Sequence, residues 1–126
     1  MSKYDVNNFY IPAPITHVTL TNDKTGVMWS NVPVLIDTGS DVTLIPSKVI
    51  ERLQLAIDNT TQYELTGFDE KTSLAHFVNL TLIFEGYTFR GQFLLVDQDM
   101  GILGRNVLNR LKLTFDGPNL QWFVAK

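Results

Sequence analysis

The sequence lacks several features that would support common kinds of site. It contains no cysteine, which excludes disulfide bonds, thiolate catalysis and cysteine-ligated zinc sites. Its two histidines, His17 and His76, are far apart in the chain and cannot form a multi-histidine metal site alone. The longest apolar stretches, such as Val32–Ile36, are far shorter than the roughly 20 residues of a membrane-spanning helix.

Basic residues are also scarce. Ten Lys and Arg stand against 13 Asp and Glu, for a formal net charge of −3. Nucleic acids and anionic membranes both require a basic protein surface, so neither is an expected partner. The first ten residues contain no apolar core of the signal-peptide kind, and we therefore expect a cytoplasmic protein, although the absence of cysteine is also compatible with an oxidising compartment.

The chain is long and apolar enough for one domain. Its 126 residues, of which 44% are hydrophobic, can form a single sizeable core. We expect residues 15–126 to form this domain and residues 1–14, which contain Asn and Pro, to be a loosely ordered N-terminal extension.

Most of the patterning predicts β-strands. Apolar and polar residues alternate clearly from Val78 to Phe84, and turn residues separate the strands. Pro33 indicates an edge or a bulge in its strand. The strands are expected over Ile15–Thr21, Val27–Ile36, Phe77–Glu85, Thr88–Val96 and Leu120–Val124.

Helical spacing is limited to Lys48–Ala56 and Arg105–Leu111. The fold class is therefore all-β: a small closed barrel with one or two short helices.

One candidate for chemistry lies in the segment Val34–Thr43, where an apolar strand leads directly into Asp37-Thr38-Gly39-Ser40. A carboxylate at a strand end, beside backbone N–H groups and small hydroxyl side chains, is well placed to be oriented. Asp, Gly and Ser are also ordinary turn residues, so the tetrapeptide alone fits a plain turn equally well.

A second segment, Met100–Leu108, contains an apolar pair followed by Gly104, Arg105 and Asn106. Together the two segments resemble the retropepsins, single-domain aspartic proteases of retroviruses and their cellular relatives. They occur in the family's order, with 67 positions from Asp37 to Gly104, and the resemblance extends from Ile15 to Phe123.

The resemblance implies a role for each residue of the first motif. Asp37 would be the catalytic acid, and Thr38 would hydrogen-bond to its counterpart across a dimer. Gly39 would make backbone contacts near the substrate. Ser40 would donate a hydrogen bond to the Asp37 carboxylate and tune it, which predicts an activity optimum below neutral pH.

The resemblance also implies support from the second motif. Asp41 and Arg105 would form an ion pair that braces the site, although two unrelated solvated charges would look the same in the sequence. Gly104 belongs to the segment that crosses behind the catalytic acid. Asn106 would open the following helix or serve only as a helix start signal.

The family's chemistry needs two carboxylates that share one proton, and this chain has one Asp-Thr-Gly copy. The resemblance therefore implies a homodimer that hydrolyses peptide or protein substrates without a metal or another cofactor. Such an enzyme also needs a flap, for which Gln62–Phe77 is the candidate, with Gly67 and Phe68 at its tip. The tip has one glycine and three consecutive charges, Asp69 to Lys71, unlike the glycine-rich apolar tips of viral enzymes.

Two alternatives remain at this point. The chain could be a retropepsin-like dimerisation or protein-binding module with little or no proteolytic activity. It could also be a small monomeric β-barrel that binds a ligand. The C-terminal residues Trp122 and Phe123 fit either a dimer sheet or an intramolecular core.

Overall fold

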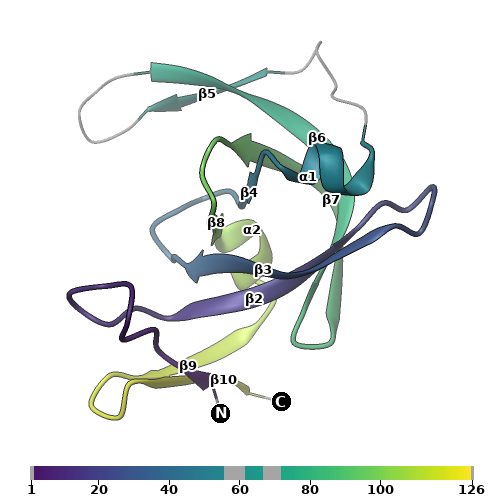
Figure 1. Ribbon diagram of the computed structural model, residues 1–126. Coiled ribbons are helices and arrows are strands. Elements are labelled where there is room, and N and C mark those ends of the chain that lie inside the picture. The colour runs from purple at the N-terminus through teal and green to yellow at the C-terminus, as the bar shows by residue number, and fades with distance from the viewer. Residues whose placement is uncertain (1, 56–61, 67–71, 126) are drawn as a thin grey trace.

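A closed barrel carries the fold. The computed structural model describes residues 2–55, 62–66 and 72–125. Six of its strands are neighbours around the barrel, in the order β2 (Ile15–Thr21), β3 (Met28–Ile36), β8 (Gly101–Leu103), β4 (Leu44–Pro46), β7 (Tyr87–Val96) and β6 (Thr72–Phe84). Pairing of Leu20 in β2 with Leu82 in β6 closes the ring (Figure 1). The predicted all-β barrel class is therefore confirmed.

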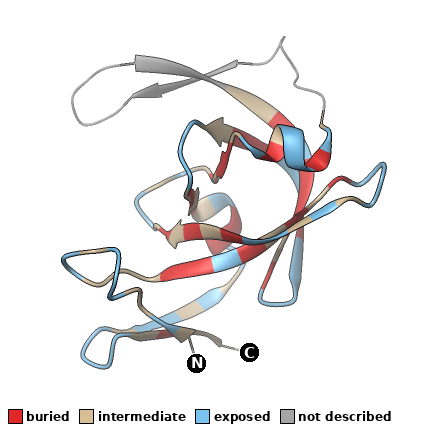
Figure 2. Cartoon of the chain, in the orientation of Figure 1, coloured by how far each residue is buried: buried red, intermediate tan, exposed pale blue. Residues whose placement is uncertain are grey.

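The alternation seen in the sequence places the core. Val78, Leu80, Leu82 and Phe84 of β6 are all buried, whereas Asn79 between them is exposed. Strands β2 and β3 contribute Val18, Leu20, Val32 and Val34, each at most 1% exposed. Figure 2 shows the buried residues concentrated on the barrel strands and the exposed ones on the connecting loops.

Both helices are shorter than the sequence predicts. Helix α1 (Val49–Leu53) buries Val49 and Leu53 against the barrel and ends because Gln54 adopts a left-handed conformation with φ of 53°. Helix α2 (Arg105–Leu108) buries Val107 and Leu108. Neither has a side-chain N-cap, so each is stabilised by the packing of its apolar face. No helix within the described residues is long and apolar enough to span a membrane.

Pro33 lies where its strand is paired along one edge. It stands opposite His17 of β2, and the pairing of β3 with β8 begins only at Val34. The register between β2 and β3 shifts between Val18 and Leu20, and Asn31 nearby has a positive φ of 60°. The edge interpretation therefore applies to Pro33, whereas the bulge lies two residues earlier, between Trp29 and Val32.

The chain ends form a separate sheet below the barrel in Figure 1. Strand β10 (Gln121–Ala125) pairs with β9 (Lys112–Asp116) on one side and with β1 (Ser2–Lys3) on the other. The N-terminal residues, expected to be a loosely ordered extension, are instead folded onto the domain because backbone hydrogen bonds attach them to its last strand.

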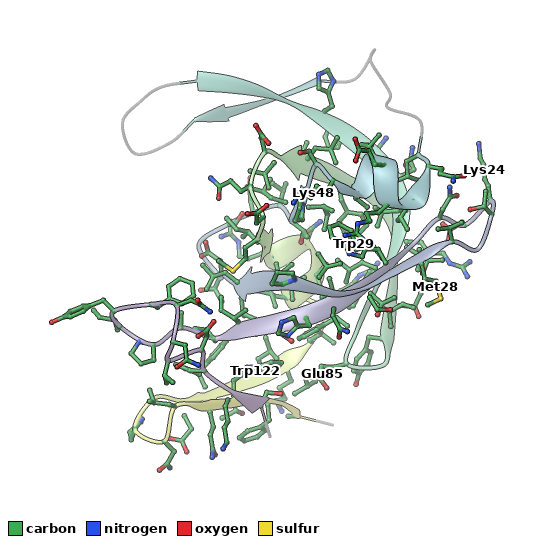
Figure 3. All side chains as sticks on the ribbon, in the orientation of Figure 1. Lys24, Met28, Trp29, Lys48, Glu85 and Trp122 are labelled. Carbon is green, nitrogen blue, oxygen red and sulfur yellow. The ribbon has the colours of Figure 1, made fainter. Side chains whose placement is uncertain are left out.

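Trp122 joins this terminal sheet to the barrel. Its side chain, labelled in Figure 3, is 1% exposed. The ring stacks on Phe84, with the two ring centroids 5.8 Å apart. Of the two roles left open for this residue, the structure gives the intramolecular core.

The arms of the predicted flap are present as a hairpin. Strand β5 (Gln62–Thr66) pairs antiparallel with the first residues of β6, from Gln62 opposite His76 to Thr66 opposite Thr72. Strand β6 is therefore longer than predicted, since its first part belongs to this hairpin and its second part to the barrel. The tip residues Gly67 and Phe68 lie outside the described residues.

Candidate active site

Asp37 stands directly after β3, at the start of a turn. The buried Ile36 ends the strand, and the backbone N–H of Asp37 donates to the carbonyl of Leu103 in β8 at 3.1 Å. The N–H of Gly39 donates to Asp37 Oδ1 at 2.8 Å, which orients the carboxylate. Thr38 and Gly39 are exposed, so the turn presents its outer side to solvent in the single chain.

Strand β8 crosses behind this turn at very close range. It lies between β3, with which it is parallel, and β4, with which it is antiparallel. A Cβ atom on Gly104 would come within 3.0 Å of the backbone of Val42, closer than real Cβ atoms approach other atoms. A Cβ atom on Gly101 would meet the carbonyl oxygen of Leu44 in the same way. The crossing therefore requires glycine at both positions.

Thr43 links the two segments and was not identified from the sequence as a site residue. It is fully buried, accepts a hydrogen bond from the N–H of Gly104 at 3.0 Å, and donates to Asn106 Oδ1 at 2.7 Å. Asn106 consequently does not cap α2, whose N-cap position is Gly104. The sequence feature that could have indicated this role is the threonine six positions after Asp37, because a buried hydroxyl group needs hydrogen-bond partners.

The expected ion pair between Asp41 and Arg105 is not formed. Within the described residues the only ion pair is Lys48 with Asp99, whose side chains are both largely exposed. Arg105 instead binds backbone carbonyls of the turn. The Nη1 of Arg105 donates to Thr38 O at 2.7 Å, and the Arg105 backbone N–H donates to Ser40 O at 2.8 Å. Carbonyls are available here because the tight turn leaves them without strand partners, while Asp41 points to solvent.

The expected tuning of Asp37 by Ser40 is also corrected. The Ser40 hydroxyl donates to the carbonyl oxygen of Val42 at 2.6 Å. A hydroxyl has a single proton to donate, and a carboxylate can only accept, so Ser40 cannot at the same time donate to Asp37. Gly39 supplies the donor at Asp37 instead.

The structure offers little that would hold a metal ion. Within the described part of the chain, no three or more His, Asp or Glu side chains lie close enough together to bind one. His17 is exposed on β2, opposite Pro33.

Comparisons with known proteins agree with this geometry. The family model for aspartyl proteases matches residues 18–107, a range that contains the whole first motif segment and the second as far as Val107. Among solved structures, EIAV protease complexed with the inhibitor HBY-793 superposes with a TM-score of 0.59 and 21% identity. The match covers 85% of this chain and 91% of the viral one, and it shows a shared retropepsin-like fold. No curated protein sequence matches the chain. Since the family model matches well over half of its residues, the chain belongs to the aspartyl protease family.

Proposed function

We propose that this chain is an aspartic endopeptidase that is active as a homodimer and hydrolyses peptide bonds in peptide or protein substrates. The observation that carries the proposal is Asp37: an oriented carboxylate on an exposed turn, braced from behind by the β8 crossing. The sequence supplies one such turn per chain, so a complete site needs two chains.

The chemistry follows from bringing two Asp37 carboxylates together. Two like charges about 3 Å apart cannot both ionise, so the pair retains one proton. The ionised member takes a proton from a bound water, which attacks the carbonyl carbon of the scissile bond, while the protonated member polarises the carbonyl oxygen. The tetrahedral gem-diol then collapses as the amine leaves with a proton.

The other site residues would hold the carboxylate in place. Gly39 N–H fixes one oxygen of Asp37, and Arg105 holds the Thr38 and Ser40 carbonyls. Thr43 ties the far end of the turn to Gly104 and Asn106. These bonds restrict the turn before a partner or substrate arrives, which is what a precise two-carboxylate site requires.

Cleavage of a diverse peptide mixture, analysed by mass spectrometry between pH 3 and pH 7, tests the proposal. Wild type is compared with Asp37→Asn and with wild type plus a statine-type inhibitor. We expect cleavage by wild type alone, because an amide in place of the Asp37 carboxyl group neither accepts a proton from water nor carries the shared one.

The oligomeric state of the same samples decides what a negative result means. Failure to cleave by a folded, dimeric wild type would overturn the enzymatic role and leave a protein-binding module. Cleavage that persists in Asp37→Asn would show that another group does the chemistry.

A further inference from the structure

The N-terminal segment forms a loop of defined shape. Residues 6–12, called the N-terminal loop below, are closed at their base by two backbone hydrogen bonds between Asp5 and Ala13, at 2.8 and 3.2 Å. The Asp5 carboxylate accepts from the N–H groups of Asn7 and Asn8 at 2.9 and 3.1 Å, and from Asn8 Nδ2 at 2.8 Å. The loop is therefore held by its own hydrogen bonds.

This ordered loop exposes apolar side chains. Val6 is 54% exposed, Ile11 76%, and Tyr10 is as exposed as in an extended chain. Single exposed apolar residues are common, but three within one seven-residue loop, two of them adjacent, are typical of a contact surface. Covering them would be favourable by about 25 cal/mol per Å² of apolar area.

The chain just after the loop is bonded to the end of β3, directly before the Asp37 turn. The N–H of Ile36 donates to the carbonyl of Pro14 at 3.0 Å, and Asp37 is the next residue. Ile11 precedes Pro14 by three residues, a span of at most roughly 11 Å. Figure 1 shows the N-terminal loop and the end of β3 extending from the same side of the barrel.

A cavity of about 880 Å³ opens at the base of the loop. Its polar members include His17 and Asp99. Its apolar lining comes from the residue after β1, from the loop, from β2 and β3, and from the residue before β8: Tyr4, Val6, Phe9, Ile15, Pro33 and Met100. The same face thus carries an apolar protrusion and a partly apolar recess, which is the self-complementarity that a two-fold interface needs.

We propose that the N-terminal loop and the cavity at its base are a contact surface for a second copy of this chain. This inference rests on the proposed function, because two Asp37 carboxylates about 3 Å apart bring the partner against the turn that lies next to the base of the loop. The proposed homodimer thus places a second copy beside the loop whether or not substrate is bound. Strand β1 pairs with β10 of its own chain, so the contact uses the loop and requires no exchange of the N-terminal strand.

The double variant Tyr10→Ser/Ile11→Ser tests the surface. Its matched control is Met28→Ser/Tyr87→Ser, which removes two other exposed apolar side chains, 56% and 41% exposed. Met28 lies on the side of the barrel away from the loop (Figure 3). Sedimentation velocity over a concentration series gives the dimer dissociation constant of each protein, and thermal unfolding verifies that each is folded.

We expect the loop variant to raise the dissociation constant at least about tenfold, and the control to leave it unchanged. Above its dissociation constant, the loop variant should recover the wild-type kcat, because neither residue belongs to the catalytic machinery. An unchanged dissociation constant in the loop variant would overturn the inference while leaving the homodimer intact. An unchanged dissociation constant with a raised KM would also overturn it, because the loop would then contact substrate. A wild type that stays monomeric and inactive at every concentration would overturn the proposed function itself.

Discussion

Gly104 is the residue at which the crossing strand and the Asp37 turn come closest. A methyl group there would overlap the backbone carbonyl of Val42. Because a Cβ atom and a backbone carbonyl are both fixed by the main chain, no side-chain rotation relieves the clash. We expect Gly104→Ala to lower the free energy of unfolding by about 3 kcal/mol and to reduce cleavage strongly. Denaturant unfolding and the peptide assay measure the two effects.

Gly117→Ala is the matched control for this substitution. Gly117 lies in the turn between β9 and β10, and a Cβ atom there would have no atom within 4 Å. The free energy of unfolding of Gly117→Ala should stay within about 0.5 kcal/mol of the wild-type value. Equal behaviour of the two variants would contradict the requirement for glycine at the crossing.

Ser40 gives a second prediction at this scale. Because its hydroxyl proton is donated to Val42 O, removing the hydroxyl takes nothing from the Asp37 carboxylate. Ser40→Ala should cost about 1 kcal/mol of stability from the lost hydrogen bond, and the pH profile of cleavage should coincide with that of wild type. A shifted profile would mean that the hydroxyl turns toward Asp37 in the active dimer.

The sequence was enough to predict which residues lie together at the site, but not which hydrogen bonds their side chains form. The motifs brought Asp37, Gly104 and Arg105 together correctly, because their spacing reflects the β8 crossing. The partners of Ser40 and Arg105 were predicted wrongly. A side chain in a tight turn has several acceptors within reach, and backbone carbonyls left without strand partners compete with carboxylates.

The same contrast holds for whole elements. The barrel half of β6 and β7 were predicted because each has enough residues to show alternation. Strands β2 and β3 were predicted because both are rich in apolar and β-branched residues and a turn-like segment separates them. Strands β4 and β8, which flank the site, have three residues each, too few for a period. The helices were overestimated because helical spacing continued past Gln54 and Leu108, where the backbone leaves the helix.

The N-terminal loop supplies a prediction for an element. Hydrogen bonds hold the pKa of Asp5 below its usual value of 3.8. The bond from the Asn8 side chain has the largest effect, and those from the backbone N–H groups of Asn7 and Asn8 have smaller ones. A lowered folded-state pKa means that the stabilisation is present above the unfolded pKa and lost as pH falls through the folded one. The amide proton shifts of Asn7 and Asn8 should therefore titrate together by NMR, with a midpoint below 3.8.

Asp5→Asn provides the control for this titration, since an amide side chain does not ionise in that range. Its Asn7 and Asn8 signals should stay flat at the pH where those of wild type move. A wild-type midpoint above 3.8, or a titration that persists in the variant, would contradict the hydrogen-bonded loop.

At the scale of the whole molecule, a single chain already holds the Asp37 turn in its braced form. The turn is braced by backbone contacts within one protomer, and the terminal strands pair within the chain. A protomer of this kind can fold before it associates. In the proposed homodimer, association would add the second carboxylate rather than complete the fold. Activity should then depend on chain concentration, while secondary structure should not.

Mixing wild type with Asp37→Asn tests directly whether each active dimer needs the Asp37 carboxylates of both chains. In an equal mixture that exchanges subunits freely, about one dimer in four contains two wild-type chains, while the number of dimers has doubled. If both carboxylates are required, activity falls to about half that of the same amount of wild type alone. Three parts of variant to one of wild type should leave about a quarter, because the activity per wild-type chain equals the wild-type fraction. An unrelated protein at the same concentrations should leave the activity unchanged. Activity that stays unchanged after subunit exchange would mean that each Asp37 works independently, and a rise toward about 1.5 times would mean that one Asp37 per dimer is enough for full activity.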